Sequence, residues 1–249
     1  IDDILIISTP TDLPRFEELL GDGSQFGIKL FYCVQPSPDG LAQAFILGEE
    51  FIGDDECAMI LGDNIFYGNG LGDKLRKAVQ NAERGKATVF GYYVNDPERF
   101  GIMEIDSNER ILSVEEKPKN PKSNYCITGL YFYPKGVSEK AKKVVPSDRG
   151  ELEITSLNDI YLKENILNGI ILGRGYAWLD TGTMDSLVEA ADFVQMIEKR
   201  QGVKISAPEE IAYRNGWISK DNLLESAKRY GKSPYGKHLK NVAEGKFVY

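Results

Sequence analysis

Short apolar runs alternate with helical patterns over the first ninety residues, and this alternation is the feature that most constrains the fold. Strands are predicted over residues 4–8, 30–34, 57–61 and 87–92. Helices are predicted between them, over residues 12–20, 41–50 and 71–83. Such an alternation is typical of a parallel α/β sheet with helices on its faces. The uninterrupted apolar run over 57–61 predicts a strand that is buried on both faces.

The pattern changes after residue 100. Strands are predicted over 102–105, 111–114 and 127–132, with a turn at 106–108, which indicates an antiparallel insertion. Further strands at 170–172 and 176–180 precede a long helix over 184–199 and short helices within 208–230. We therefore predict an α/β fold: a mixed, mainly parallel twisted sheet flanked by helices, with a helical C-terminal appendage. The expected domains are residues 1–200 and 201–249.

The charge and composition exclude several classes of protein. The chain has 38 acidic and 30 basic residues and a net charge of −8, so its surface should repel nucleic acid. No apolar run is long enough to cross a membrane, and no signal peptide is expected. The three cysteines are far apart in apolar contexts, which predicts buried free thiols in a reducing compartment. These features favour a cytoplasmic protein without nucleic-acid or membrane partners.

His238 is the only histidine of the chain, and this limits the possible chemistry. Hydrolases that pair a serine or cysteine with histidine, and zinc sites rich in histidine, are both disfavoured. The remaining candidates are carboxylates, lysine, arginine and a hard metal ion.

Two aspartates follow predicted strands, where ligands of open α/β sheets bind. Asp63 follows the 57–61 run and a glycine, and Asp180 follows the apolar stretch 176–179. Two such carboxylates could share one divalent cation, which prefers carboxylate oxygens and substrate phosphates. The alternative is that both aspartates only form turns through local hydrogen bonds.

Three other places carry candidate binding residues. The amide of Gln35 matches the hydrogen-bonding edge of thymine or uracil, and Gly40 would allow close approach to the backbone. Glu116 and Lys117 could hold a sugar hydroxyl and a phosphate. Trp178 could stack on a sugar ring. The structural alternatives are a polar loop, a charged hairpin end and a core tryptophan, respectively.

Several segments together closely resemble the glucose-1-phosphate thymidylyltransferases, a family of sugar nucleotidyltransferases, and the resemblance extends over essentially the whole chain. The matching segments are residues 34–44, 61–68, 95–101, 115–118, 128–132, 173–183 and 208–214.

The resemblance implies a Rossmann-like fold of the nucleotide-diphospho-sugar transferases, with a sugar-binding part at about 95–183. It also implies an enzyme that joins dTTP and glucose 1-phosphate to give dTDP-glucose and pyrophosphate, the first step of dTDP-rhamnose or deoxysugar synthesis. Mg²⁺, a homotetramer and feedback by a dTDP-sugar are expected with it. The implied residues are Gln35, Gly40 and Asp63 for the nucleotide, Asp63 and Asp180 for Mg²⁺, and Asn64, Gly101, Glu116, Lys117, Ile127 and Trp178 for the sugar phosphate, with Asp63, Lys117 and Asp180 catalytic.

The family pattern opens with a strand and a Gly-Gly-x-Gly-Thr-Arg-Leu phosphate loop that the printed sequence does not contain. We therefore expect the sequence to be N-terminally incomplete and the chain alone to be inactive. Two alternatives stay open. One keeps the reaction but uses UTP or another sugar phosphate, because thymine and uracil present the same edge to Gln35. The other is a non-catalytic sensor of sugar nucleotides.

Overall fold

The computed structural model describes residues 1–246, and their mixture of helices and strands confirms the predicted α/β class. The chain divides into two compact units, one of residues 37–190 and one of residues 1–36 with the chain from residue 191 onward. This division differs from the predicted domains, whose boundary at residue 200 stays a prediction.

The unit of residues 37–190 contains most of the strands. They are β3 (Cys57–Ile60), β4 (Asn64–Gly68), β5 (Ala87–Tyr93), β6 (Gly101–Ile105), β7 (Ile111–Glu116), β8 (Tyr125–Tyr133), β9 (Leu167–Leu172) and β10 (Tyr176–Asp180). Its helices are α2 (Gln43–Leu47), α3 (Glu49–Ile52), α4 (Leu71–Glu83), the 3₁₀ turn η2 (Pro97–Arg99), α5 (Val137–Ala141) and α6 (Ile154–Lys163).

The main sheet of this unit is mixed, but its pairs are mostly antiparallel. Its order is β7-β6-β8-β5-β9, with β3 paired to β8 in addition. Only β5 and β9 run parallel, while β8 is antiparallel to β3, β5 and β6. Sequence patterning predicted a mainly parallel sheet because apolar runs do not encode strand direction. The long strand β8 reverses the chain and thereby sets the direction of three pairs.

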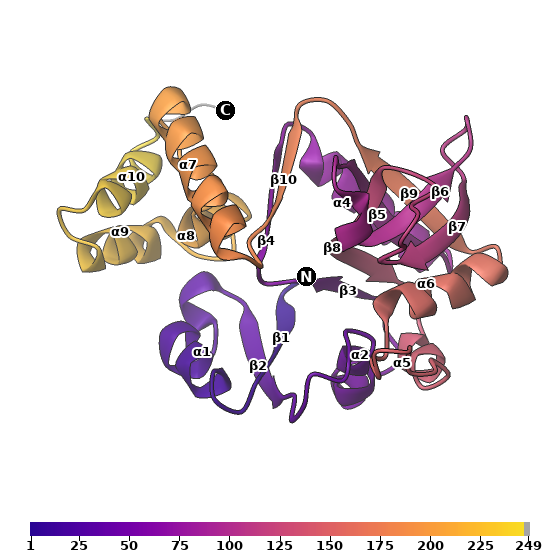
Figure 1. The fold of residues 1–249 in the computed structure, drawn as a ribbon. Helices are drawn as coiled ribbons and strands as arrows, with labels where there is room; N and C mark the ends of the chain where they lie inside the picture. The colour runs from indigo at the N-terminus through magenta and orange to yellow at the C-terminus, as the bar shows by residue number, and fades with distance from the viewer. Residues whose placement is uncertain (247–249) are drawn as a thin grey trace. The chain divides into compact units, whose positions relative to one another are not determined.

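The two faces of the sheet are covered by different helices (Figure 1). Phe90 and Phe132 pack with Ala78 of α4, whereas Val89 and Tyr133 pack with residues of α2, α5 and α6. Because successive side chains of a strand point to opposite faces, this alternation along β5 and β8 places α4 on one face and the other three helices opposite. The core therefore lies in two layers on either side of β5 and β8.

A second, two-stranded sheet joins segments that are far apart in the sequence. β4 and β10 pair antiparallel along their length, with Asn64 opposite Asp180 and Phe66 opposite Trp178 (Figure 1). The sequence analysis missed β4, since a five-residue strand after a turn has little pattern of its own. This pair brings the segment after β3 to the end of β10.

The other unit combines the first strands with the C-terminal helices. β1 (Asp3–Ser8) and β2 (Lys29–Val34) form a parallel pair. The remaining elements are α1 (Leu13–Leu20), η1 (Ser24–Phe26), α7 (Met184–Gln201), α8 (Pro208–Arg214), α9 (Lys220–Arg229) and α10 (Pro234–Ala243). Helix α7 begins in the unit of residues 37–190. No helix within residues 1–246 combines the length and the apolar character needed to cross a membrane.

Two buried glutamates connect the C-terminal helices. Glu209 of α8 accepts hydrogen bonds from the hydroxyls of Tyr230 (2.9 Å) and Tyr235 (2.5 Å). Glu210 lies 2.6 Å from the ring of His238 in α10. Burial and the contact with Glu209 raise the pKa of Tyr235 well above its usual range. The single histidine thus has a buried carboxylate partner within its own unit.

We expect Glu209→Ala to lower the free energy of unfolding by about 2 kcal/mol, because two hydrogen bonds to a buried side chain are lost. Urea denaturation followed by circular dichroism measures the change. Glu225→Ala, on the exposed face of α9, is the matched control and should change stability by less than about 0.5 kcal/mol. Equal stability of the two variants would contradict the prediction.

The three cysteines are free, and only Cys126 is fully buried. Burial nevertheless raises the pKa of the Cys57 and Cys126 thiols to about 12. Because the thiolate is the reactive form, both stay protonated and unreactive at pH 8. We expect Ellman's reagent to modify only Cys33 in the folded protein and all three thiols in denaturant. Rapid labelling of more than one thiol without denaturant would contradict this.

Candidate active site

A cavity of about 520 Å³ lies in the unit of residues 37–190. It gathers most of the predicted sugar and metal residues. Those that line it are Asn64, Gly101, Glu116, Lys117, Ile127, Trp178 and Asp180. Strands β4, β6, β7, β8 and β10 and the turn after β7 supply them, so residues spread over more than a hundred positions meet in one place.

The two predicted metal carboxylates come together because of the pairing of β4 with β10. Asp63 immediately precedes β4, and Asp180 ends β10 opposite Asn64. The backbone N–H and the hydroxyl of Thr181 both donate to the Asp63 carbonyl, at 2.9 and 2.8 Å. A Cβ built on Gly182 would lie 3.4 Å from Asp180 Oδ2 and 3.6 Å from Asp63 Oδ2. Both carboxylates therefore face the same small space beside Gly182.

The electrostatics of Asp180 favour a cation in this space. Burial raises the pKa of Asp180, and the neighbouring charge of Asp63 raises it further. Arg99 and Lys117 oppose the shift but do not cancel it. The deprotonated carboxylate is thus costly in the protein alone, and a bound cation would offset that cost.

The donor set fits a hard divalent ion such as Mg²⁺. Both donors are carboxylates, and no group of three or more His, Cys, Asp or Glu side chains within residues 1–246 could hold a metal. Mg²⁺ is typically held by one or two carboxylates, with substrate phosphates and water as its other ligands. Asp63 and Asp180 would hold such an ion and leave most of its coordination positions to a substrate.

Glu116 is held by two side chains that sequence reasoning did not identify. The hydroxyl of Thr155, at the start of α6, donates to Glu116 Oε2 at 2.5 Å. Arg149 Nη2 lies 3.4 Å from Glu116 Oε1 and donates to buried Glu153 at 2.8 Å. These contacts orient the carboxylate at the end of β7. Arg149 and Thr155 lie 33 and 39 positions after Glu116, and nothing in their local sequence pattern indicated a contact with β7.

Lys117 has a backbone conformation that is unusual for a residue other than glycine. Its φ is 42°, in the left-handed region, and its N–H donates to the Phe100 carbonyl at 3.1 Å. Non-glycine residues in this region carry a conformational cost that the surrounding structure must offset, and they gather at functional sites. The turn after β7 thereby places Lys117 among the residues that line the cavity.

Trp178 is both a core residue and a lining residue. Its side chain is buried and packs edge-on against Phe100, with ring centroids 5.3 Å apart. Tyr92 and the buried Ile102 and Cys126 belong to the same small cluster. The cluster fixes the indole at the wall of the cavity.

The predicted base-binding residues Gln35 and Gly40 are not among the residues that line the cavity. Gln35 follows β2 and belongs to the other unit, where its N–H donates to the Ser8 carbonyl at 2.8 Å. Gly40 has a φ of 106°, and a Cβ there would lie 2.4 Å from the Leu152 carbonyl oxygen. The fold itself therefore requires glycine at position 40, because the backbone at Leu152 occupies that space. Their contact with a base stays a prediction.

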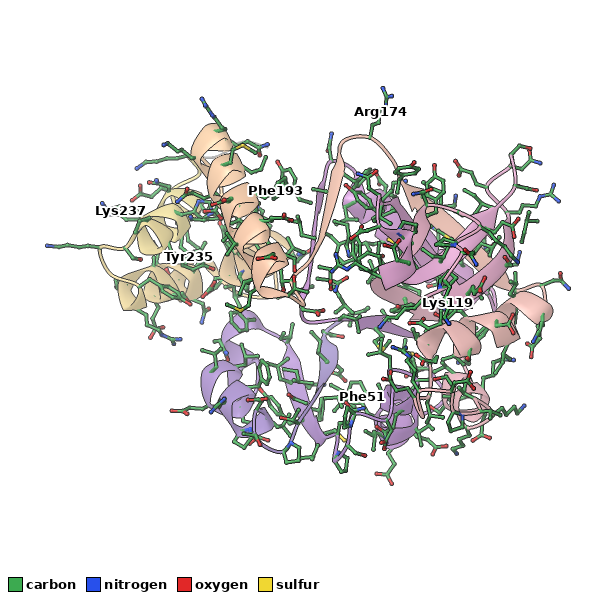
Figure 2. All side chains as sticks on the ribbon, viewed as in Figure 1. Phe51, Lys119, Arg174, Phe193, Tyr235 and Lys237 are labelled. Atoms are coloured by element: carbon green, nitrogen blue, oxygen red, sulfur yellow. The ribbon has the colours of Figure 1, made fainter. Side chains whose placement is uncertain are left out.

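Two arginines from segments that match the family pattern differ in their position relative to the cavity. Arg99, which sequence reasoning did not single out, lines the cavity beside Asp180 and is held by Asp96 at 2.7 Å. Arg174, in contrast, lies at the tip of the connection between β9 and β10 and points outward (Figure 2). Within the 173–183 segment, only the part after β10 begins contributes to the cavity.

We expect Gly101→Ala to raise the KM for glucose 1-phosphate, the substrate that the resemblance implies, about ten-fold, because the new Cβ would lie 2.8 Å from Thr155 Oγ1 and 3.2 Å from Glu116 Oε2. The loss of one hydrogen bond to a charged group accounts for the size of the effect. Gly173→Ala is the matched control, since a Cβ there meets nothing within 4 Å. Steady-state kinetics of both variants test the prediction, and an unchanged KM in Gly101→Ala would contradict it.

The nucleotidyl transferase family matches residues 1–196, and this match assigns the chain to that class of protein. The chain is 56% identical over 239 residues to the glucose-1-phosphate thymidylyltransferase of Neisseria gonorrhoeae, covering 96% of this chain and 82% of that protein. It is 52% identical over 244 residues to that of Xanthomonas campestris pv. campestris, covering 98% and 82%. The chain belongs to the glucose-1-phosphate thymidylyltransferase family, whose members are enzymes.

Solved structures agree with this assignment. A Bacillus anthracis protein assigned as a glucose-1-phosphate thymidylyltransferase, in complex with sucrose, is similar with a TM-score of 0.70 and 40% identity, covering 78% of this chain and 76% of that one. A UDP-glucose pyrophosphorylase complexed with UDP-glucose has a TM-score of 0.61 at 19% identity, covering 77% and 80%. The second likeness concerns the fold alone.

Proposed function

We propose that the chain joins dTTP and glucose 1-phosphate to give dTDP-glucose and pyrophosphate, with Mg²⁺ as cofactor. The observation that carries the proposal is that Lys117 and Asp180 line one cavity together with Glu116 and Thr155, whose hydroxyl orients the Glu116 carboxylate. The ammonium group of Lys117 can neutralise one phosphate, and a cation bound by Asp63 and Asp180 can neutralise others. This combination of charges suits two phosphorylated substrates. The names of the relatives supply the identity of the base and the sugar.

The sugar phosphate is held by side chains from β7 and β10. Glu116, oriented by Thr155, accepts hydrogen bonds from sugar hydroxyls, and Trp178 packs against the ring. Lys117 neutralises the phosphate of the sugar, and Asn64, Gly101 and Ile127 complete the wall. Gln35 and Gly40 contact the thymine.

The reaction is an in-line displacement. A phosphate oxygen of glucose 1-phosphate attacks the α-phosphorus of dTTP, and the bond from that phosphorus to the β-phosphate oxygen breaks, releasing pyrophosphate. Asp63 and Asp180 would hold Mg²⁺, which would neutralise charge on the phosphates. Positioning and charge neutralisation dominate such transfers, so no nucleophilic side chain is required.

Pyrophosphate release from glucose 1-phosphate tests the proposal, with dTTP, UTP, CTP and ATP supplied in turn. The chain is assayed as printed and together with any residues that precede Ile1 in its gene. Activity that is strongest with dTTP is expected. Preference for UTP would mean that the base of the nucleotide substrate is uracil and not thymine. Binding of dTDP-glucose without turnover by either form of the chain would favour the sensor alternative.

The proposal includes properties that the resemblance implies: a homotetramer in the cytoplasm, inhibited by a dTDP-sugar formed later in dTDP-rhamnose or deoxysugar synthesis. Sedimentation equilibrium tests the assembly. A monomer at all concentrations of the active protein would refute the tetramer without affecting the proposed reaction.

A further inference from the structure

The side-chain amide of Asn64 links the tryptophan of the cavity wall to a metal carboxylate. Its Oδ1 accepts a hydrogen bond from Trp178 Nε1 at 2.7 Å and another from the Gly129 backbone N–H at 3.0 Å. Its Nδ2 donates to Asp63 Oδ1 at 2.8 Å. All three contacts join residues of the same unit, and together they connect β4, β8 and β10.

These contacts determine which way the amide points. An indole N–H and a backbone N–H can only donate, so the oxygen of the amide must face them. A flipped amide would place its NH₂ group against two donors and its oxygen against the Asp63 carboxylate. Trp178 and Gly129 therefore compel Asn64 to present its N–H to Asp63.

Gly129 supports the same interpretation. Glycine in the interior of a strand costs stability and often marks the close approach of another group. A Cβ at position 129 would lie 2.6 Å from Asn64 Oδ1 and 2.8 Å from the side chain of Leu61. The glycine in the middle of β8 thus leaves the space in which the amide oxygen sits.

The consequence concerns the direction of the Asp63 carboxylate. Asn64 holds its Oδ1, while its Oδ2 faces the space beside Gly182 that Asp180 also faces. We propose that Asn64 is a positioning residue for the metal site, which turns Asp63 toward the cation and is itself locked by Trp178 and Gly129. This inference rests on the proposed function, because it requires that the carboxylate pair holds a cation.

Binding of Mn²⁺ to the protein alone, measured from the electron paramagnetic resonance signal of the free ion, tests the inference. Residues that hydrogen-bond a metal ligand typically change metal affinity by about 10- to 100-fold when replaced. We expect Asn64→Leu, which is similar in shape but has no polar group, to bind Mn²⁺ about ten-fold more weakly. Trp178→Phe keeps an aromatic ring but removes the hydrogen bond of the indole to the amide oxygen, and it should weaken binding about three-fold.

The matched control is Asn81→Leu, the same substitution in α4, where Asn81 donates to Thr88 at 3.1 Å. It should bind Mn²⁺ as the unaltered protein does. Melting curves establish that each variant is folded, and Trp178→Phe decides the question if Asn64→Leu does not fold. In turnover assays, Asn64→Leu should raise the Mg²⁺ concentration for half-maximal rate about ten-fold.

Asp180→Asn separates the possible failures. If it abolishes Mn²⁺ binding while Asn64→Leu and Trp178→Phe bind normally, the positioning role is overturned and the proposed metal site stands. A raised KM for glucose 1-phosphate in Asn64→Leu with unchanged Mn²⁺ affinity also overturns it, since Asn64 would then be a sugar ligand only. If Asp180→Asn has no effect on Mn²⁺ binding, the metal site and the inference both fail.

Discussion

Asp180→Asn is expected to lower the rate of nucleotidyl transfer about 1,000-fold in the active form of the protein. A metal ion at the reacting phosphates supplies several kcal/mol of transition-state stabilisation, and each 1.36 kcal/mol corresponds to a factor of ten in rate. The amide keeps the shape of the carboxylate but loses the charge that holds the ion. Pyrophosphate release at saturating substrates and varied Mg²⁺ measures the loss.

The same substitution should not weaken the fold. Because burial and Asp63 raise the pKa of Asp180, its charged form is less favourable in the folded protein than in the unfolded chain. At neutral pH the asparagine removes that cost, so the melting temperature should be equal to or above that of the unaltered protein. Asp185→Asn, at an exposed position in α7, controls for the loss of a charge. Near-normal activity of Asp180→Asn would show that Asp180 only forms a turn.

Lys117→Met is expected to lower kcat/KM for glucose 1-phosphate about 100-fold. Methionine keeps the length of the side chain and, unlike glycine, preserves the cost of the left-handed backbone at this position. The substitution therefore removes little besides the ammonium group. A hydrogen bond between charged groups is worth about 1.5–3 kcal/mol, which is the source of the expected factor.

Lys119→Met is the matched control, two residues further along the same loop and outside the residues that line the cavity (Figure 2). It should retain full activity. Initial rates over a range of glucose 1-phosphate concentrations distinguish the two variants. Equal rates for both would contradict the prediction. Lys117 would then be a solvated surface lysine at a charged hairpin end, which is the structural alternative given for it above.

Helices and strands with a strong pattern were predictable from the sequence. The helix over residues 71–83 has the observed bounds of α4, because its apolar positions recur at helical spacing. The predicted helix over 41–50 is interrupted at Gly48, where α2 ends and α3 begins. Helix α10 was missed even though Ser233 caps it and Pro234 begins it, which is a recognisable start signal.

The pairing of strands was not predictable in the same way. An apolar run is compatible with a parallel or an antiparallel neighbour, so its pattern leaves direction and register undetermined. β4 has five residues, and its partner β10 begins more than a hundred positions later. That partner identifies β4 as a strand, and the pairing exists only after the rest of the chain has folded.

The candidate site divides along the same line. Sequence alone placed Asp63 and Asp180 at strand ends and identified the family, because those properties depend on neighbouring residues and on the order of motifs. Only the tertiary structure decided that the two carboxylates share the space beside Gly182, since this follows from the register that sets Asp180 opposite Asn64. The contacts of Thr155 with Glu116 and of Asn64 with Trp178 likewise join residues 39 and 114 positions apart. Local pattern reports the neighbours of a residue along the chain, whereas a hydrogen bond between strands depends on packing of the whole unit.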